Sequence, residues 1–128
     1  MNFSKYVNIP YKYKGRDFNG CDCWGLVKLI FKKEKGITLP DFWYTDFWEE
    51  ENFIKNNIRN VNIIKVDYPF KIFDVLLFYN KKRNIVSHMG LIIEDDKFIH
   101  TYLKNASRVD RLDKYWISRL YQGVRYSG

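Results

Sequence analysis

Residues 22–35 carry the clearest structural signal in the chain. Asp22 is a natural helix N-cap, because its carboxylate can accept hydrogen bonds from the free amides of a first helical turn. Apolar residues then recur at the spacing of one helical face, lysines fall on the opposite face, and Gly36 is a typical residue at which a helix ends. The sequence therefore predicts a helix over residues 22–35. Its expected apolar face consists of Leu26, Val27, Leu29, Ile30 and Phe31.

The remainder of the chain changes to strand-like patterning. Further helices are expected over residues 46–57 and 112–119, and residues 1–20 are expected to form an irregular arm. Several short apolar segments are typical of strands. These segments are residues 61–66, 74–79, 87–93, 97–103, 106–109 and 121–126. Helices followed by antiparallel strands predict an α+β fold, and no linker or repeat divides residues 1–128 into more than one domain.

The composition narrows the setting of the protein. The net charge of +7 would suit an anionic partner, but the lysines are scattered and no recognised nucleic-acid motif accompanies them. The aromatic content of 19% suits either a small core filled with large side chains or rings that reach the surface, where residues 42–53 would line a substrate groove or a protein interface. The sequence shows no signal peptide and no apolar stretch of the roughly 18 residues that a membrane span needs. We therefore expect no nucleic-acid partner and no integral membrane segment.

The only two cysteines lie beside the predicted helix start. Cys21 and Cys23 are separated by one residue, a spacing that suits neither a disulfide nor a zinc site. Cys23 follows the predicted N-cap, where free amides and the helix dipole lower the pKa of a thiol. Gly20 and Gly25 would leave room for a substrate backbone. Cys23 is therefore a candidate nucleophile, and the alternative is an inert buried cysteine.

A cysteine nucleophile needs a base, and the chain has two histidines, His88 and His100. Both belong to the predicted hairpin. If its turn consists of the three residues 94–96, His100 lies opposite Gly90, and His88 is diagonal to His100 at about 7–8 Å between Cα atoms. Gly90 would then leave room for both rings. A two-residue turn would move His100 to the other face, and a metal site of cysteines and histidines is a further alternative that the Cys-x-Cys spacing disfavours.

Several segments occur in an order that is specific in combination. They are Tyr11, Asp22-Cys23-Trp24-Gly25-Leu26-Val27, Phe73-Asp74-Val75-Leu76-Leu77-Phe78, His88-Met89-Gly90-Leu91 and Phe98-Ile99-His100. On these motifs the sequence resembles the NlpC/p60 papain-like cysteine peptidases over about residues 6–103. The resemblance implies N-terminal helices packed on a central antiparallel β-sheet.

The resemblance also implies a Cys-His-His site. Cys23 would attack a peptide carbonyl, and His88 would take the thiol proton and later protonate the leaving amine. His100 would orient His88. Tyr11 would help to stabilise the oxyanion, with Tyr13 as a rival because the spacing allows slippage. The implied reaction needs no cofactor and no metal.

Asp22, Trp24 and Ser87 are further residues that we expect to contact the substrate. Trp24 replaces the usual small residue after the nucleophile and would narrow the groove, whereas Cys21 is expected to pack. This form of the motif, followed by residues 36–41, looks most like the branch of the family in phage and prophage tail proteins.

The implied function is an endopeptidase that cuts peptides of bacterial peptidoglycan as a phage or prophage tail-tip component. Its partners would be the stem peptide and other tail proteins, and it would lie in the virion tail, or in the host cytoplasm before assembly. The alternatives are an amidase or acyltransferase at the same site, a structural tail protein with a degenerate site, and a nucleic-acid binder.

Overall fold

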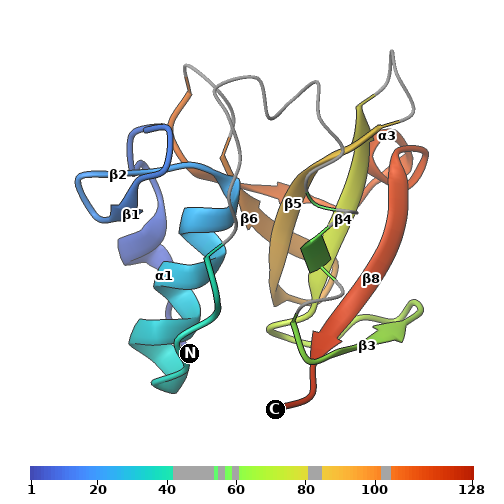
Figure 1. Ribbon diagram of the computed structural model, residues 1–128. Coiled ribbons are helices and arrows are strands. Elements are labelled where there is room, and N and C mark those ends of the chain that lie inside the picture. The colour runs from blue at the N-terminus through green and yellow to red at the C-terminus, as the bar shows by residue number, and fades with distance from the viewer. Residues whose placement is uncertain (42–53, 55–56, 59–60, 81–84, 102–104) are drawn as a thin grey trace.

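The computed structural model describes residues 1–41, 54, 57–58, 61–80, 85–101 and 105–128 (Figure 1). Its elements are η1 (Ser4–Tyr6), β1 (Arg16–Asp17), β2 (Gly20–Cys21), α1 (Cys23–Lys35), β3 (Ile63–Val66), β4 (Val75–Asn80), β5 (Ile85–Glu94), β6 (Lys97–His100), β7 (Arg108–Arg111), α3 (Lys114–Ile117) and β8 (Leu120–Tyr126). No helix within these ranges is long and apolar enough to cross a membrane. The helix expected over 46–57 and the aromatic segment 42–53 lie largely outside the described residues.

The predicted helix over 22–35 is confirmed as α1. The Asp22 carboxylate accepts a hydrogen bond of 2.8 Å from the Gly25 amide, so Asp22 is the N-cap. Gly36 ends the helix in the left-handed conformation, at φ 66°, which glycine adopts without steric cost. The apolar face is buried, as the periodicity predicts.

The six-stranded sheet is antiparallel throughout, in the order β3-β8-β4-β5-β6-β7. Alternation along the central strands divides their side chains between two buried clusters. Val75, Leu77 and Leu91 belong to the main core with the apolar face of α1, and Figure 1 shows α1 standing beside the sheet. Leu76 and Phe78 belong to a smaller cluster with Trp116 of α3. The predicted α+β fold, with helical structure packed on an antiparallel sheet, is confirmed.

The β5–β6 hairpin differs from the prediction at its turn. Glu94 pairs with Lys97 across a two-residue turn, and a bulge then shifts the register so that Leu91 pairs with Ile99. The three-residue turn is therefore wrong, but the bulge adds back the residue that the shorter turn removes. In the resulting register the next position places His100 across from Gly90, as expected.

Gly90 makes room for a different ring from the one predicted. A Cβ atom at Gly90 would lie 2.5 Å from Cδ2 of Phe98. The glycine is thus needed by the aromatic cluster of the sheet rather than by the two histidines.

The N-terminal segment is more ordered than expected. Residues 16–17 and 20–21 pair as β1 and β2, and the Cys21 amide donates to the Pro10 carbonyl at 3.0 Å. The prediction of an irregular arm is therefore wrong for this part, because two-residue strands are too short to show a period in the sequence. Strand β7 is also displaced from the predicted 106–109.

Candidate active site

Cys23 is the first residue of α1, and its side chain is buried. The backbone amides of Met89 and Trp24 bond to its sulfur. Met89 follows His88 directly on β5. This contact therefore ties the thiol at the helix start to the strand that carries the first histidine.

Burial raises the pKa of the Cys23 thiol well above its usual value, and the neighbouring Asp22 carboxylate raises it further. The hydrogen bonds from the Met89 and Trp24 amides and the charge of Arg16 act in the opposite direction but are smaller. The expected lowering of this pKa is therefore wrong, because the loss of water outweighs the helix start. The resting side chain is a thiol, so a base must remove its proton before the sulfur can attack.

Two glycines near Cys23 make room for the chain itself. A Cβ atom at Gly25 would lie 1.9 Å from the Gly15 carbonyl oxygen, and one at Gly20 would lie 2.5 Å from Cβ of Lys12. The N-terminal segment fills the space that was expected for a substrate backbone, so that expectation is wrong.

Cys21 packs, as predicted. Its thiol is buried and donates to the Asp17 carbonyl at 3.1 Å. Burial raises the pKa of Cys21 to about 12, with smaller contributions from the Asp22 and Asp17 carboxylates.

His88 and His100 are brought together by the hairpin. His88 Nε2 and His100 Nδ1 are 2.8 Å apart, a hydrogen-bonding distance between two buried rings. The bulge described above produces the diagonal contact on which the sequence argument depended. The two histidines are therefore positioned as one hydrogen-bonded pair.

An aromatic cluster surrounds this pair. The His100 ring lies 4.7 Å from the Phe98 ring and 5.0 Å from the Trp116 ring, and the His88 ring lies 5.9 Å from Phe78. Burial lowers the pKa of His88 well below its usual value, with smaller effects from His100 and the Arg119 charge. Burial also lowers the pKa of His100 to about 4, against the opposing effect of Asp110. Both rings are neutral near pH 7.

Asp110 on β7 extends the chain of polar groups and was not among the residues predicted from the sequence. Its Oδ2 atom lies 2.6 Å from His100 Nε2 and accepts a second hydrogen bond, of 2.9 Å, from Arg108 Nε. In the β6–β7 register Asp110 pairs with Phe98, so it is diagonal to His100. The strand predicted over 106–109 ends before Asp110. A register for β7 would have been needed to find this residue.

Tyr11 lies beside the cysteine segment. It forms a parallel bridge with Cys21, and its amide donates to the Asn105 carbonyl at 3.1 Å. Tyr13 lies under the Lys14 ammonium, at 5.5 Å from Nζ to the ring centroid. Both rings pack against the main core. The bridge brings the backbone of Tyr11 next to the segment that leads into Cys23.

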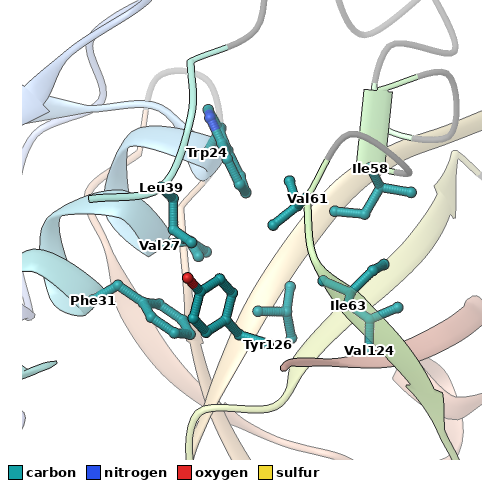
Figure 2. A pocket seen from close by; sticks show the side chains of 10 residues that line it. Trp24, Val27, Phe31, Leu39, Ile58, Val61, Ile63, Val124 and Tyr126 are labelled. Atoms are coloured by element: carbon teal, nitrogen blue, oxygen red, sulfur yellow. The ribbon is translucent and has the colours of Figure 1, made fainter. Parts of the chain in front are cut away.

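Trp24 points into the core. Its side chain is 2% exposed, and its Nε1–H donates to the Pro40 carbonyl at 3.1 Å. With residues of α1, β3 and β8 it lines an apolar cavity of about 20 Å³ between helix and sheet (Figure 2). This burial gives the ring a packing role, and the predicted contact between Trp24 and a substrate stays a prediction.

The Asp22 carboxylate is used within the fold. Besides capping α1, it accepts a hydrogen bond from the Lys14 amide at 2.9 Å and one from Arg16 Nη1 at 3.0 Å. Ser87 is buried on β5 at the irregularity in its pairing with β4. The predicted substrate contacts of Asp22 and Ser87 stay predictions.

Thr101 carries a buried polar atom and was not among the residues predicted from the sequence. Its Oγ1 has no hydrogen-bond partner within the described part of the chain. In the same ranges no group of three or more His, Cys, Asp or Glu side chains is arranged to hold a metal ion.

The α1–sheet arrangement, with Cys23 at the helix start and the histidine pair on neighbouring strands, defines a papain-like α+β protein. The model of the NlpC/P60 family matches residues 8–125. The chain therefore belongs to the NlpC/P60 family, as the resemblance of its motifs implied.

Two curated relatives and one solved structure illustrate the range of this similarity. The chain is 28% identical to the gamma-DL-glutamyl hydrolase of Bacillus subtilis over 123 residues, covering 94% of this chain and 27% of the relative. It is 27% identical to the tail tip assembly protein K of Escherichia phage N15 over 109 residues, covering 82% of this chain and 44% of the relative. It thus spans less than half the length of either protein. The NlpC/p60 domain of the peptidoglycan hydrolase SagA has the same fold, with a TM-score of 0.65, 18% identity, and coverage of 94% of this chain and 90% of that domain.

Proposed function

We propose that the protein is a cysteine endopeptidase that hydrolyses peptide bonds in bacterial peptidoglycan and acts as part of a phage or prophage tail. One observation carries the proposal. His88 and His100 form a neutral, hydrogen-bonded pair. His88 directly precedes Met89, whose backbone amide donates a hydrogen bond to the Cys23 sulfur. A thiol at a helix start with a base beside it is the arrangement that nucleophilic catalysis by cysteine requires.

The proposed reaction starts from a neutral thiol and a neutral imidazole. His88 takes the proton from Cys23, and the sulfur attacks the carbonyl carbon of the substrate peptide bond. The carbonyl oxygen becomes an oxyanion, which Tyr11 and a backbone amide of the α1 start stabilise. As the C–N bond breaks, His88 gives its proton to the leaving amine. A water molecule, deprotonated by His88, then hydrolyses the thioester and releases the carboxylic acid and the free thiol.

The substrate class and the tail role rest on the relatives. A glutamyl hydrolase is 28% identical to this chain, a domain of a peptidoglycan hydrolase shares its fold, and a tail tip assembly protein is 27% identical to it. A peptide-hydrolysing site in a tail-tip protein would serve to open the bacterial cell wall when the phage enters the cell.

The test is digestion of purified peptidoglycan, with identification of the released fragments by mass spectrometry. The wild type is expected to release peptides with new amino and carboxyl ends, and Cys23→Ala is expected to release none. Cys21→Ala is the matched control, because it removes the other buried thiol two residues away and should keep activity.

Three outcomes would contradict the proposal. Release of intact stem peptides from the glycan would indicate an amidase. No release from walls of several chemotypes would favour a structural tail protein. Equal activity of wild type and Cys23→Ala would remove the cysteine from the mechanism.

A further inference from the structure

The hydrogen-bonded series His88–His100–Asp110 ends at the Asp110 carboxylate. This carboxylate restricts which ring nitrogens of the two histidines can carry a proton. Asp110 Oδ2 is 2.6 Å from His100 Nε2, and Arg108 Nε donates to the same oxygen at 2.9 Å. A carboxylate only accepts hydrogen bonds. His100 must therefore carry its proton on Nε2 to make this contact.

The same reasoning passes through the two rings. With its proton on Nε2, a neutral His100 has an unprotonated Nδ1, which can only accept. His88 Nε2 lies 2.8 Å from that atom, so His88 must donate and carries its proton on Nε2. The remaining nitrogen of the neutral His88 ring, Nδ1, then carries no proton.

We propose that Asp110 is a positioning residue that fixes the tautomers of both histidines, so that His88 presents an unprotonated Nδ1 as the base. This inference rests on the proposed function, in which His88 deprotonates Cys23. Asp110 acts through His100 and does not touch the reacting atoms. When His88 gains a proton, its positive charge can be partly balanced through the same chain of hydrogen bonds.

The position of Asp110 limits the size of its effect. Its side chain is 26% exposed on β7, whereas the side chain of His100 is fully buried. Water screens a partly exposed carboxylate. We therefore expect loss of Asp110 to slow catalysis by about 10-fold to 100-fold, less than the roughly 10⁴-fold known for a buried triad aspartate.

The direct test is nitrogen-15 NMR of the two imidazoles near pH 7, in which protonated and unprotonated ring nitrogens are resolved. The chain has only two histidines, so the spectrum contains four ring nitrogens, and His88→Gln assigns them. The wild type is expected to show a protonated Nε2 and an unprotonated Nδ1 in both rings. A proton on Nδ1 of either ring would overturn the proposal.

Two substitutions separate the acceptor from the charge. In Asp110→Ala the acceptor is gone, and both histidines should show mixed tautomers together with the reduced rate. In Asp110→Asn the amide oxygen can still accept from His100 and Arg108, so the tautomers should persist while the rate falls less. Asp95→Ala is the matched control, because Asp95 is an exposed aspartate in the β5–β6 turn, and it should change neither measurement.

The NMR result does not depend on activity. Wild-type tautomers as expected, with no digestion of peptidoglycan, would contradict the proposed function alone. Unchanged tautomers and an unchanged rate in Asp110→Ala would contradict the role of Asp110 alone.

Discussion

The cysteine side of the candidate site (residues 11–25) and its histidine side (strands β5 to β7) are held in different ways. On the cysteine side the contacts of the Asp22 carboxylate are local, since it caps α1 and accepts from the Lys14 amide eight residues away. On the histidine side the hydrogen bonds of the two rings cross from one strand to the next, from His88 to His100 and from His100 to Asp110.

On each side one carboxylate raises the pKa of its neighbour, but Asp22 acts in the same direction as burial and Asp110 acts against it. Asp22 adds to the effect of burial and raises the pKa of the Cys23 thiol. Asp110 opposes burial and raises the pKa of His100. The Cys23 thiol therefore keeps its proton at rest, and His88 is the group that receives it in the proposed reaction. Reactivity therefore depends on contact between the two sides, because the helix start alone does not activate the thiol.

Trp24→Ala tests whether Trp24 belongs to the cysteine side as packing. Removal of a buried indole is expected to lower the free energy of unfolding by about 3–5 kcal/mol, as measured by urea denaturation. Trp24→Phe keeps most of the apolar volume but loses the hydrogen bond to Pro40, so it should cost about 1–2 kcal/mol with KM unchanged. A raised KM with normal stability would instead return Trp24 to the substrate groove.

Tyr11→Phe tests the oxyanion role on the same side. Loss of one oxyanion donor is expected to lower kcat by about 10²–10³-fold, as measured by the rate of fragment release. Tyr13→Phe is the matched control and should stay near the wild-type rate. A large loss in Tyr13→Phe but not in Tyr11→Phe would assign the oxyanion role to Tyr13. If neither variant loses activity, backbone amides alone stabilise the oxyanion.

Acid should lower the free energy of unfolding, because the buried neutral histidines bind protons more weakly than they do in the unfolded chain. The pKa of His100 is about 4 in the folded protein and roughly 6.5 in an unfolded chain. The unfolded chain therefore binds more protons between these values, and stability is lost as the pH falls from about 6.5 towards 4. We expect a loss of about 2 kcal/mol from His100 between pH 7 and pH 4.5, with His88 adding in the same direction. Urea denaturation at several pH values measures this slope, which should become shallower in His100→Gln. A flat profile would contradict the buried neutral pair.

Thr101→Val should give the smallest effect. The Thr101 hydroxyl is buried and has no partner among the described residues, and valine has nearly the same shape. We expect the free energy of unfolding to rise by about 1 kcal/mol, measured by denaturation at pH 7. A decrease would mean that the hydroxyl makes a stabilising contact.

The two sides also differ in how far the sequence alone could describe them. The cap at Asp22, the helix and its end at Gly36 follow from local rules, and the structure agrees with each. The pairing of His88 with His100 was predicted from an assumed turn, which was wrong by one residue, and a bulge at the hairpin restored the register. Bulges leave little trace in a sequence.

Two features depended on contacts between distant residues and could not be predicted. Asp110 is joined to His100 only through the β6–β7 register. The raised pKa of Cys23 arises from burial by the whole fold, whereas the helix start, which the sequence does reveal, predicts the opposite shift. Trp24 belongs with these, because its place after the nucleophile gave no indication that its ring turns into the core.

The central claim is that Cys23 and His88 act as one catalytic unit, and a double-mutant cycle tests it most directly. Fragment release from peptidoglycan is measured over long incubations for wild type, Cys23→Ala, His88→Ala and the double variant. Groups that act as a unit lose their effect together, so each single variant should fall by about 10³-fold or more, and the double variant should be no slower than the slower single variant. A single variant that stays within about tenfold of wild type, or losses that multiply in the double variant, would contradict the account.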